Sequence, residues 1–383
     1  MLGALFAAGI ATFAQLYSPQ AALPQIARDL QIDPARAAVV ISASTIGLAA
    51  GVIPWSVVAD RLGRVRAMSV AISAATVCGL LVPFAPTFGL LLSGRVLEGL
   101  LVGGVPAVAI AYLSEEVEAV STSRAAGTYV AGTTVGGLAG RIVAGTVADV
   151  VGWRAGVLAV AVVCAVAAVL FVRLAPVPRG FRPDNARVDL RETLARRVRA
   201  NLRSRRQLAI YAQGFLLMGG FVALYNYLGF RLAAPPFSLA PALISLLFLA
   251  YLAGTWSSAK AGAIAATRGR LPVLVVATAL MTVGVLTTLV DVLAAVLVGT
   301  VVATVGFFAA HAVASGWVGG DAPAGRAQAS SLYNLFYYAG SSLFGWLGGV
   351  FFVAHGWSGT AAMIVTLALF SMAVAALVLR STD

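Results

Sequence analysis

The chain has 383 residues, of which 60% are hydrophobic and 10% are charged, and its formal net charge is +12. The mean hydropathy of +0.95 excludes an ordinary soluble domain, because such a domain needs a polar surface to stay dispersed. A strongly basic chain can bind nucleic acid, but charged residues are too scarce here for that class of protein. The composition predicts an all-α membrane protein whose first partner is the lipid bilayer.

Apolar runs long enough to cross a bilayer form two sets of six. Each crossing helix needs about 20 predominantly apolar residues. The first run has neither a basic start nor a small-residue cleavage site, so we expect a retained helix rather than a signal peptide. In chain order the predicted spans are about 3–24, 37–58, 67–84, 88–113, 125–148, 155–174, 207–229, 240–262, 272–290, 292–318, 328–352 and 358–379.

A basic segment separates the two sets of spans. Between Arg173 and Arg206 there are eleven arginines and three acids, so eight of the twelve net positive charges lie there. We therefore expect an N-terminal six-helix bundle over 1–174, a basic linker over 175–206 and a C-terminal six-helix bundle over 207–383.

The loop charges predict the orientation in the membrane. If both termini are cytoplasmic, the inner loops hold twenty Lys and Arg residues and the outer loops hold four. This imbalance follows the positive-inside rule, so we expect a cytoplasmic linker and two cytoplasmic termini. The four outer basic residues are Arg28, Arg36, Arg154 and Arg231.

The two halves repeat short patterns at nearly one spacing. A segment that starts at Ser56 follows the second span, and a matching one that starts at Gly262 follows the eighth, 206 residues later. Gly152-Trp153 returns as Gly356-Trp357 at a spacing of 204. These two echoes predict a parallel repeat of six helices, which is typical of two-bundle secondary transporters.

Several motifs resemble the major facilitator superfamily of transporters. Asp60-Arg61-Leu62-Gly63-Arg64 is similar to its motif A, and Arg95-x-x-Glu98-Gly99 is similar to its motif B. The glycines from Gly132 to Gly140 resemble motif C of its drug:proton antiporters, and Gly103–Ala107, Tyr112–Glu116 and Asn226–Leu232 resemble its YnfM-type branch of efflux proteins. The resemblance implies two pseudo-symmetric six-helix bundles in a bacterial inner membrane, and proton-coupled efflux of the multidrug type by alternating access.

Departures from these motifs keep a second class of substrate open. Ser56 stands where motif A begins with Gly, Val65 separates its closing bases, and Gly137 replaces the Pro of motif C. Arg141 replaces the closing Gly of motif C, and the second copy of motif A has lost its acid at Ala266. The added positive charge leaves import or exchange of an organic anion or zwitterion as the alternative to export.

Four residues of the motif A segment form the predicted gate: Asp60, Arg61, Gly63 and Arg64. An acid at a helix end can meet backbone donors or a nearby arginine, and Gly63 allows the tight turn of a short loop. One interpretation is a latch that opens and closes with the inward-facing state. The other is a set of solvated charges that only determine topology.

Three charges within the predicted spans are expected to form a buried charge cluster. Arg95, Glu98 and Arg141 each cost about 2.5–3.5 kcal/mol at the middle of a membrane helix, so partners are expected. Arg95 and Glu98 lie one turn apart on one helix face, and arginines that reach toward the outer headgroups are the alternative. By elimination Glu98 is the predicted proton-coupling acid, and Asp60 is the second choice.

Amide and aromatic residues of four spans form the predicted lining of a substrate cavity. In the superfamily fold these spans surround the central path, and amides are costly against lipid. Tyrosines near helix ends are also typical of the membrane interface, so we expect only part of this set to contact a small-molecule substrate. The set is Gln15, Tyr17, Gln20, Asn226, Tyr227, His311, Tyr333, Asn334 and Tyr337.

The sequence carries no pattern for a cofactor, a metal site or ATP hydrolysis. Cys78 and Cys164 lie in apolar spans, where a free Cys behaves as a small hydrophobe. The two histidines, His311 and His355, are far apart, and no P-loop is present, so ion gradients must supply the energy. We expect a monomeric transporter that is not an enzyme; a membrane enzyme or receptor is the alternative from another class.

Overall fold

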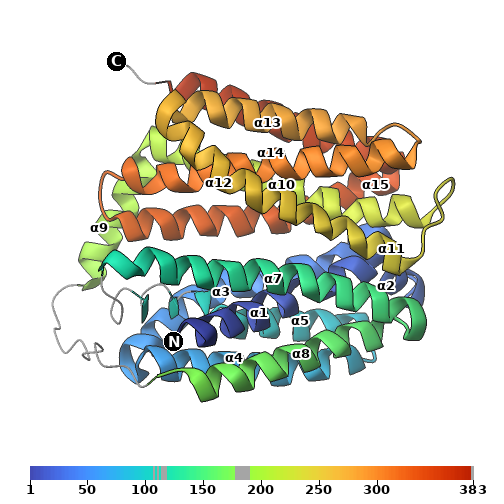
Figure 1. Cartoon of the computed structure of the whole chain (residues 1–383), viewed down its shortest axis with the longest axis horizontal. Coiled ribbons are helices and arrows are strands. Elements are labelled where there is room, and N and C mark those ends of the chain that lie inside the picture. The colour runs from blue at the N-terminus through green and yellow to red at the C-terminus, as the bar shows by residue number, and fades with distance from the viewer. Residues whose placement is uncertain (107, 110–111, 114–118, 177–189, 381–383) are drawn as a thin grey trace. The chain divides into compact units, whose positions relative to one another are not determined.

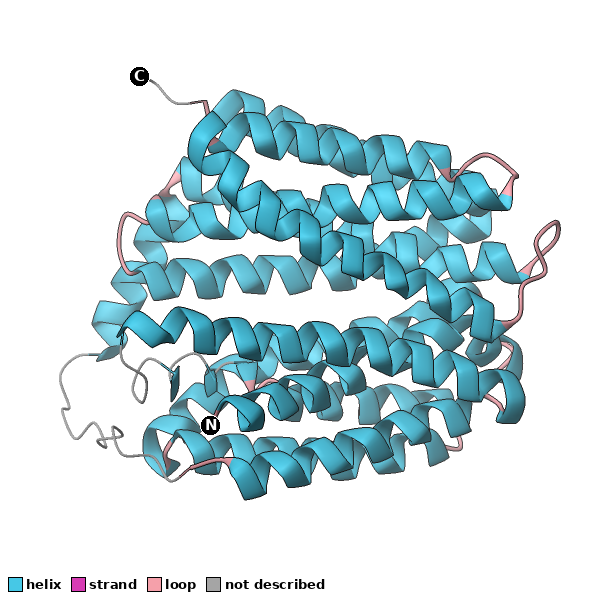
Figure 2. Cartoon of the chain, viewed as in Figure 1, coloured by secondary structure: helices cyan, strands magenta, loops and turns pink. Residues whose placement is uncertain are grey.

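The structure, a computed structural model, describes residues 1–106, 108–109, 112–113, 119–176 and 190–380. The described residues form helices and connecting loops without a strand (Figure 2). The α-helices are α1 Leu2–Tyr17, α2 Leu23–Asp29, α3 Pro34–Leu62, α4 Arg64–Leu81, α5 Phe88–Val102, α7 Ala119–Val151, α8 Trp153–Leu174, α9 Leu190–Arg203, α10 Arg205–Ala233, α11 Pro241–Ser245, α12 Ala250–Arg268, α13 Arg270–Thr287, α14 Leu293–Gly320 and α15 Arg326–Val378. Short 3-10 helices cover η1 Ser18–Ala22, η2 Val82–Phe84 and η3 Leu246–Leu249.

Ten helical stretches of the described chain are long and apolar enough to cross a membrane. The last of them contains two predicted spans, because 53 residues of α15 would extend about 80 Å at 1.5 Å per residue. It breaks at His355 and Gly356, whose backbones leave the helical region, between the predicted spans 328–352 and 358–379. The remaining predicted span, 88–113, begins as α5. This helix has 15 residues, which are too few to cross a membrane by themselves.

The described chain divides into two compact units. The first contains the described residues among 1–32, 36–186 and 239–248, and the second contains those among 33–35, 187–238 and 249–383. In the first unit α1 packs against α7 and α8, and α4 packs against α5 and α8 (Figure 1). In the second unit α10 packs against α15, and α14 packs against α12 and α13. Residues 177–189 of the predicted linker, and Ala107 and Ser114–Glu116 of the quoted motifs, lie outside the described residues.

Equivalent glycines of the internal repeat have similar backbone conformations in the two halves. Gly63 has φ +89° and Gly269 has φ +87°, and each joins two helices after a single residue. Gly152 and Gly356 also have positive φ, at +100° and +62°, and each precedes a tryptophan. Only glycine adopts these conformations without strain. The pairs are 206 and 204 residues apart, so the predicted repeat extends to the turns that shape each half.

The glycine series of α7 lets α1 approach backbone to backbone. A Cβ atom on Gly136 or Gly140 would lie only 2.6 or 2.7 Å from a Cα atom of α1. The facing pairs are Gly132 with Phe6, Gly136 with Ile10, and Gly140 with Ala14. In the second unit Gly340 lies against the backbone of Phe215 in the same way, which joins α15 closely to α10.

Candidate functional site

The candidate site in the first unit surrounds a break in the first span. The α-helix α1 ends at Tyr17 and continues as the 3-10 helix η1 before α2 begins. Pro19 lacks an N–H group, so it cannot donate the helical hydrogen bond to the carbonyl oxygen of Gln15. The Ser18 N–H and its hydroxyl group donate to that oxygen instead. The break therefore results from the local sequence.

Arg95 of α5 binds the carbonyl oxygens at this break. Its Nη1 donates to the Gln15 oxygen at 3.3 Å, and its Nη2 donates to the Leu16 oxygen at 2.5 Å. Its Nε donates to Val40 of α3, and the side chain is fully buried. The last carbonyl groups of a helix carry partial negative charge, so a guanidinium group is well placed there.

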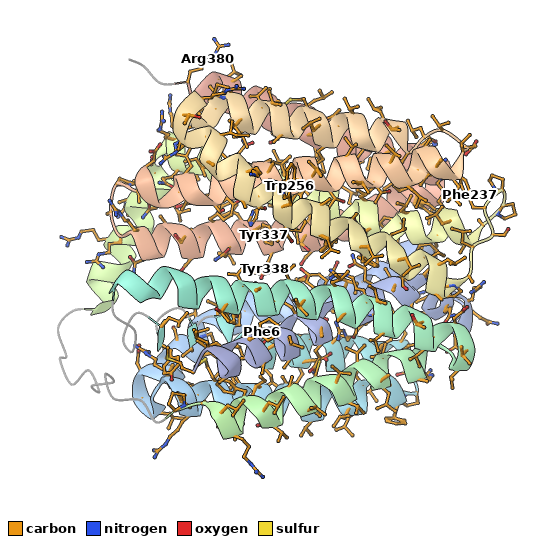
Figure 3. All side chains as sticks on the ribbon, viewed as in Figure 1. Phe6, Phe237, Trp256, Tyr337, Tyr338 and Arg380 are labelled. Carbon is orange, nitrogen blue, oxygen red and sulfur yellow. The ribbon has the colours of Figure 1, made fainter. Side chains whose placement is uncertain are left out.

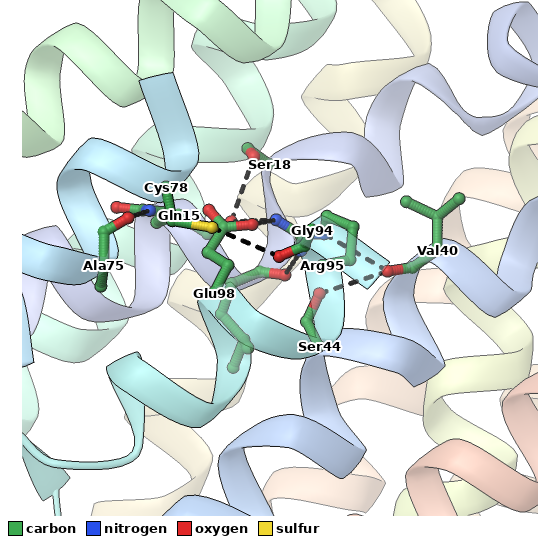
Figure 4. A network of polar contacts seen from close by, with 10 residues as sticks. Gln15, Ser18, Val40, Ser44, Ala75, Cys78, Gly94, Arg95 and Glu98 are labelled. Carbon is green, nitrogen blue, oxygen red and sulfur yellow. Dashed lines mark hydrogen bonds and ion pairs between the residues drawn. The ribbon is translucent and has the colours of Figure 1, made fainter. Parts of the chain in front are cut away.

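Glu98 forms an ion pair with Arg95 from the next turn of α5 (Figure 4). It is 2% exposed, and Gln15 also forms a hydrogen bond with its carboxylate group. The Gln15 amide donates in turn to the Ala75 carbonyl of α4 at 2.5 Å. At Gly79, a Cβ atom would lie 2.9 Å from a Glu98 oxygen, so α4 closes over the carboxylate group. The pair thus links α1, α4 and α5.

Arg141 lies on the other side of the break and has its own set of contacts. Its Nε donates to the Gln20 amide oxygen at 2.7 Å, and its Nη1 donates to the Gly137 carbonyl at 2.6 Å. The guanidinium carbon lies 4.4 Å from the ring centre of Tyr17 and 4.8 Å from that of Phe248. These are cation–π distances. The side chain is buried at 3% exposure.

The two departures from motif C are neighbours in space. A Cβ atom on Gly137 would lie 3.1 Å from Nη1 of Arg141, so glycine leaves room for the guanidinium group. Its carbonyl oxygen also accepts a hydrogen bond from that group. Gly137 and Arg141 therefore form one local arrangement.

Aromatic side chains form a cluster in the second unit. We call Phe221, Phe307, His311, Tyr333 and Tyr337 the aromatic cluster; Phe221 and Phe307 stack with their ring centres 3.9 Å apart. The Nδ1 atom of His311 lies 2.9 Å from the Tyr333 hydroxyl oxygen, at hydrogen-bond distance, and its ring lies 4.8 Å from Tyr337. Tyr337 lies on α15 (Figure 3). Phe221, Phe307 and Tyr333 are buried, and His311 and Tyr337 are half-buried.

Other predicted cavity residues lie elsewhere. Tyr227 is buried and donates to the Gly345 carbonyl at 2.6 Å, within the contact of α10 with α15. Asn226 is buried in α10, and Asn334 is exposed on α15. The structure thus brings Gln15, Tyr17 and Gln20 together at the break, and brings His311, Tyr333 and Tyr337 together in the aromatic cluster.

The predicted gate lies at the turn between α3 and α4. Asp60 and Arg64 form an ion pair of 2.5 Å across four residues, and Gly63 makes the turn between them. Asp60 and Arg61 are exposed. The side chain of Arg64 is only 16% exposed, whereas that of Asp60 is 50% exposed.

Two arginines that count as loop charges in the sequence, Arg154 and Arg231, each hold a loop in the structure, and we call them the arginine clamps. Arg154 donates to the carbonyls of Pro83 and Ala85, and Arg231 donates to Asp291 at 2.8 Å and to the carbonyls just before it. Residues 83–85 and 289–291 are 206 apart, so the clamps hold equivalent loops of the two halves. The repeat spacing was the signal that could have revealed them.

Comparison with known proteins gives the family. Residues 5–260 match the model of the Major Facilitator Superfamily. The chain is 40% identical over 371 residues to the inner membrane transport protein YnfM of Escherichia coli K12, covering 97% of this chain and 88% of that protein. It is 35% identical over 378 residues to the uncharacterized MFS-type transporter YybF of Bacillus subtilis 168, covering 99% and 93%.

Solved structures share the fold. A bacterial homologue of the human lysosomal transporter Spinster, in an inward-facing and unoccupied conformation, matches with a TM-score of 0.83 at 15% identity, covering 100% of this chain and 98% of that one. The nucleoside transporter NupG matches with a TM-score of 0.78 at 14% identity, covering both chains fully. The chain is therefore a multi-pass membrane transporter of the Major Facilitator Superfamily, and not an enzyme.

Proposed function

We propose that this transporter exports small organic molecules in exchange for protons, by alternating access. The proposal rests on the contacts of Arg95, which binds both the Glu98 carboxylate and the carbonyl oxygens at the break of α1. A buried ionisable pair inside a membrane span marks a proton or substrate pathway by default. A broken helix is where secondary transporters commonly bind their substrates.

The coupling step follows from the loss of one charge. When Glu98 accepts a proton, Arg95 keeps its charge but loses its only described ion-pair partner. A buried charge left in this state costs about 3–5 kcal/mol. A shift of the α1 break, where Gln15 and Leu16 are bound, would relieve that cost and move the residues that we assign to the cavity. Asp60 is the second candidate for the coupling acid.

The proposed substrate contacts fall into two groups. Gln15, Tyr17 and Gln20 at the break supply amide and phenol groups, and the aromatic cluster supplies stacking surface. Flat organic molecules fit such side chains. Asn226, Tyr227 and Asn334 stay in the proposed set, although the Tyr227 hydroxyl group is already engaged by Gly345.

We further propose that the two bundles over 1–174 and 207–383 rock about the 175–206 linker, and that the protein acts as a monomer. The linker and both termini would then face the cytoplasm, as the loop charges require. Asp60, Arg61, Gly63 and Arg64 would form a latch on that side. The inner membrane location named for YnfM supports a bacterial inner membrane as the location of this transporter.

A second candidate function is exchange of an organic anion or zwitterion. Arg141 favours it, because its guanidinium group is buried beside Gln20 and two aromatic rings at the break. A carboxylate group could bind a guanidinium group in this position through charge-assisted hydrogen bonds.

The test replaces Glu98 with Gln. The purified protein is first screened by thermal shift against ethidium, an aromatic cation, and benzoate, an aromatic anion. Glu98→Gln should abolish accumulation of the bound probe driven by a pH difference in proteoliposomes, while exchange of labelled for unlabelled probe continues. Asp149→Asn, which removes an exposed acid of α7, is the matched control and should accumulate normally.

Folding must be checked in parallel, because the substitution leaves Arg95 without a carboxylate. A monodisperse, helical Glu98→Gln protein that still concentrates the probe under a pH difference alone would show that Glu98 is not the coupling acid. The same assay on Asp60→Asn would then decide between the two candidate acids.

A further inference from the structure

The basic segment that divides the sequence contains a helix whose function transport does not explain. α9 ends at Arg203, and after Ser204 the chain enters α10, one of the membrane-span candidates. The Ser204 hydroxyl group accepts a hydrogen bond from the Gln207 N–H and so caps α10. Since only one residue separates α9 from this span, we expect α9 to lie near the level of the lipid headgroups.

One face of α9 is attached to the second unit. Asn201 is fully buried and donates to the Ala324 carbonyl at 2.6 Å, in the turn before α15. Arg197, one helical turn earlier, lies beside Gly325 of the same turn: a Cβ atom there would be 2.9 Å from its Cδ. These contacts set the rotation of α9 about its own axis.

The opposite face is basic and exposed. Arg196, Arg199 and Arg203 follow a spacing of three and four residues, so they project from one side of the helix. At about 100° per residue this side is turned away from Asn201. All three side chains are exposed. Residues 190–206 include seven arginines and one acid. Of the seven arginines, Arg206 forms an ion pair of 2.5 Å with Asp321.

We propose that the face of α9 formed by Arg196, Arg199 and Arg203 binds the phosphate headgroups of anionic phospholipids in the adjoining leaflet. The guanidinium fork matches phosphate oxygens, and basic helices at a membrane surface are attracted to anionic lipid. The position beside a span commits the site to lipid, because bilayer phosphates lie at that level. The proposal does not depend on the substrate or on proton coupling.

Bound lipid would also hold the turn before α15. The Asn201 bond joins α9 to Ala324, and the Arg206 pair joins the start of α10 to Asp321 at the end of α14. Lipid that orders α9 therefore stabilises the junction of α14 and α15. We expect anionic lipid to raise the melting temperature of the whole protein.

The test uses the full-length protein in nanodiscs of phosphatidylcholine, with and without phosphatidylglycerol. The variant Arg196→Gln, Arg199→Gln, Arg203→Gln should bind phosphatidylglycerol about 100-fold more weakly by native mass spectrometry, since each surface arginine contributes about fivefold. It should also lose the rise in melting temperature. The variant with Lys at the same three positions should retain most of the lipid binding and most of the rise in melting temperature.

A matched control removes three exposed arginines outside α9: Arg268→Gln, Arg326→Gln, Arg380→Gln. It lowers the net charge equally and should leave lipid binding unchanged. An equal loss of phosphatidylglycerol binding in both triple variants would overturn the proposal, because net charge alone would then explain binding.

A competition experiment separates lipid from free phosphate. If inorganic phosphate displaces the lipid at an equal concentration of phosphate groups, the site binds soluble anions and the proposal is wrong. If the triple Gln variant is not monodisperse, Arg199→Gln alone is measured, and unchanged lipid binding there contradicts the proposal.

Discussion

Arg95 satisfies two kinds of acceptor at once, a carboxylate in its own helix and two carbonyl oxygens of α1. The second kind could not be predicted from charge patterns. It arises because Pro19 interrupts helical bonding next to the place where α5 crosses α1. The chain position of Pro19 was visible in the sequence, but the position of Arg95 relative to it depends on helix packing.

Arg141 provides the residue-scale prediction. If the substrate is an anion, Arg141→Gln should weaken benzoate binding by about 10- to 100-fold, because a charged hydrogen bond is lost. Arg141→Lys should restore only part of the affinity, since lysine cannot reproduce the planar group between Tyr17 and Phe248. Isothermal titration of the folded variants measures both values.

A cationic substrate reverses that expectation. Ethidium binding should then stay the same or increase in Arg141→Gln, because a positive charge has been removed from the break. Unchanged affinity for both probes would exclude Arg141 from the substrate site and leave it as a structural contact of Gln20 and Gly137.

At the scale of elements, the turn between α3 and α4 differs from its repeat in one respect. Asp60 pairs with Arg64, whereas the equivalent position before Arg270 is Ala266. Arg270 lies 3.9 Å from Asp321 at the end of α14, so a different element supplies the acid in the second unit. Equivalent turns therefore keep their glycine conformation while their charge pairs have diverged.

Asp60→Asn tests the latch. A partly exposed ion pair contributes only about 0–1 kcal/mol, so the melting temperature should change little. The transport rate in proteoliposomes should nevertheless fall severalfold if the pair forms and breaks during the cycle. Arg64→Gln removes the basic partner of the same ion pair and should lower the transport rate by the same factor. Full transport rates in both variants would leave these charges as topology determinants only.

At the scale of the whole molecule, the arginine-rich segment predicts the orientation. A cysteine that replaces Asn185 should resist an impermeant maleimide in intact cells and react after permeabilisation. A cysteine that replaces the exposed Ala234, in a predicted outer loop, should react in intact cells. Labelling of the unsubstituted chain measures the background from its own cysteines, Cys78, which is half-buried, and Cys164, which is buried. Labelling of the Asn185 variant from outside would reverse the proposed topology.

Local properties of the sequence determined the fold class of this protein. Hydropathy marked the spans, and short sequence patterns that return after 204 or 206 residues marked the repeat. The glycines spaced by four were visible too, and the structure shows that they let α1 approach α7 closely. Each signal lies in the order of residues along the chain, so it can be read without a three-dimensional structure.

Only the tertiary structure decided which partners the buried charges have. Arg95 and Gln15 are 80 positions apart, and Arg141 and Gln20 are 121 positions apart. The cost of burying charge predicts that each arginine needs acceptors, but it does not say which. Helix crossings choose them, and here they place Arg95 before the break of α1 and Arg141 after it. The same holds for Arg231, whose partner Asp291 is reached only once α10 lies beside the loop after α13.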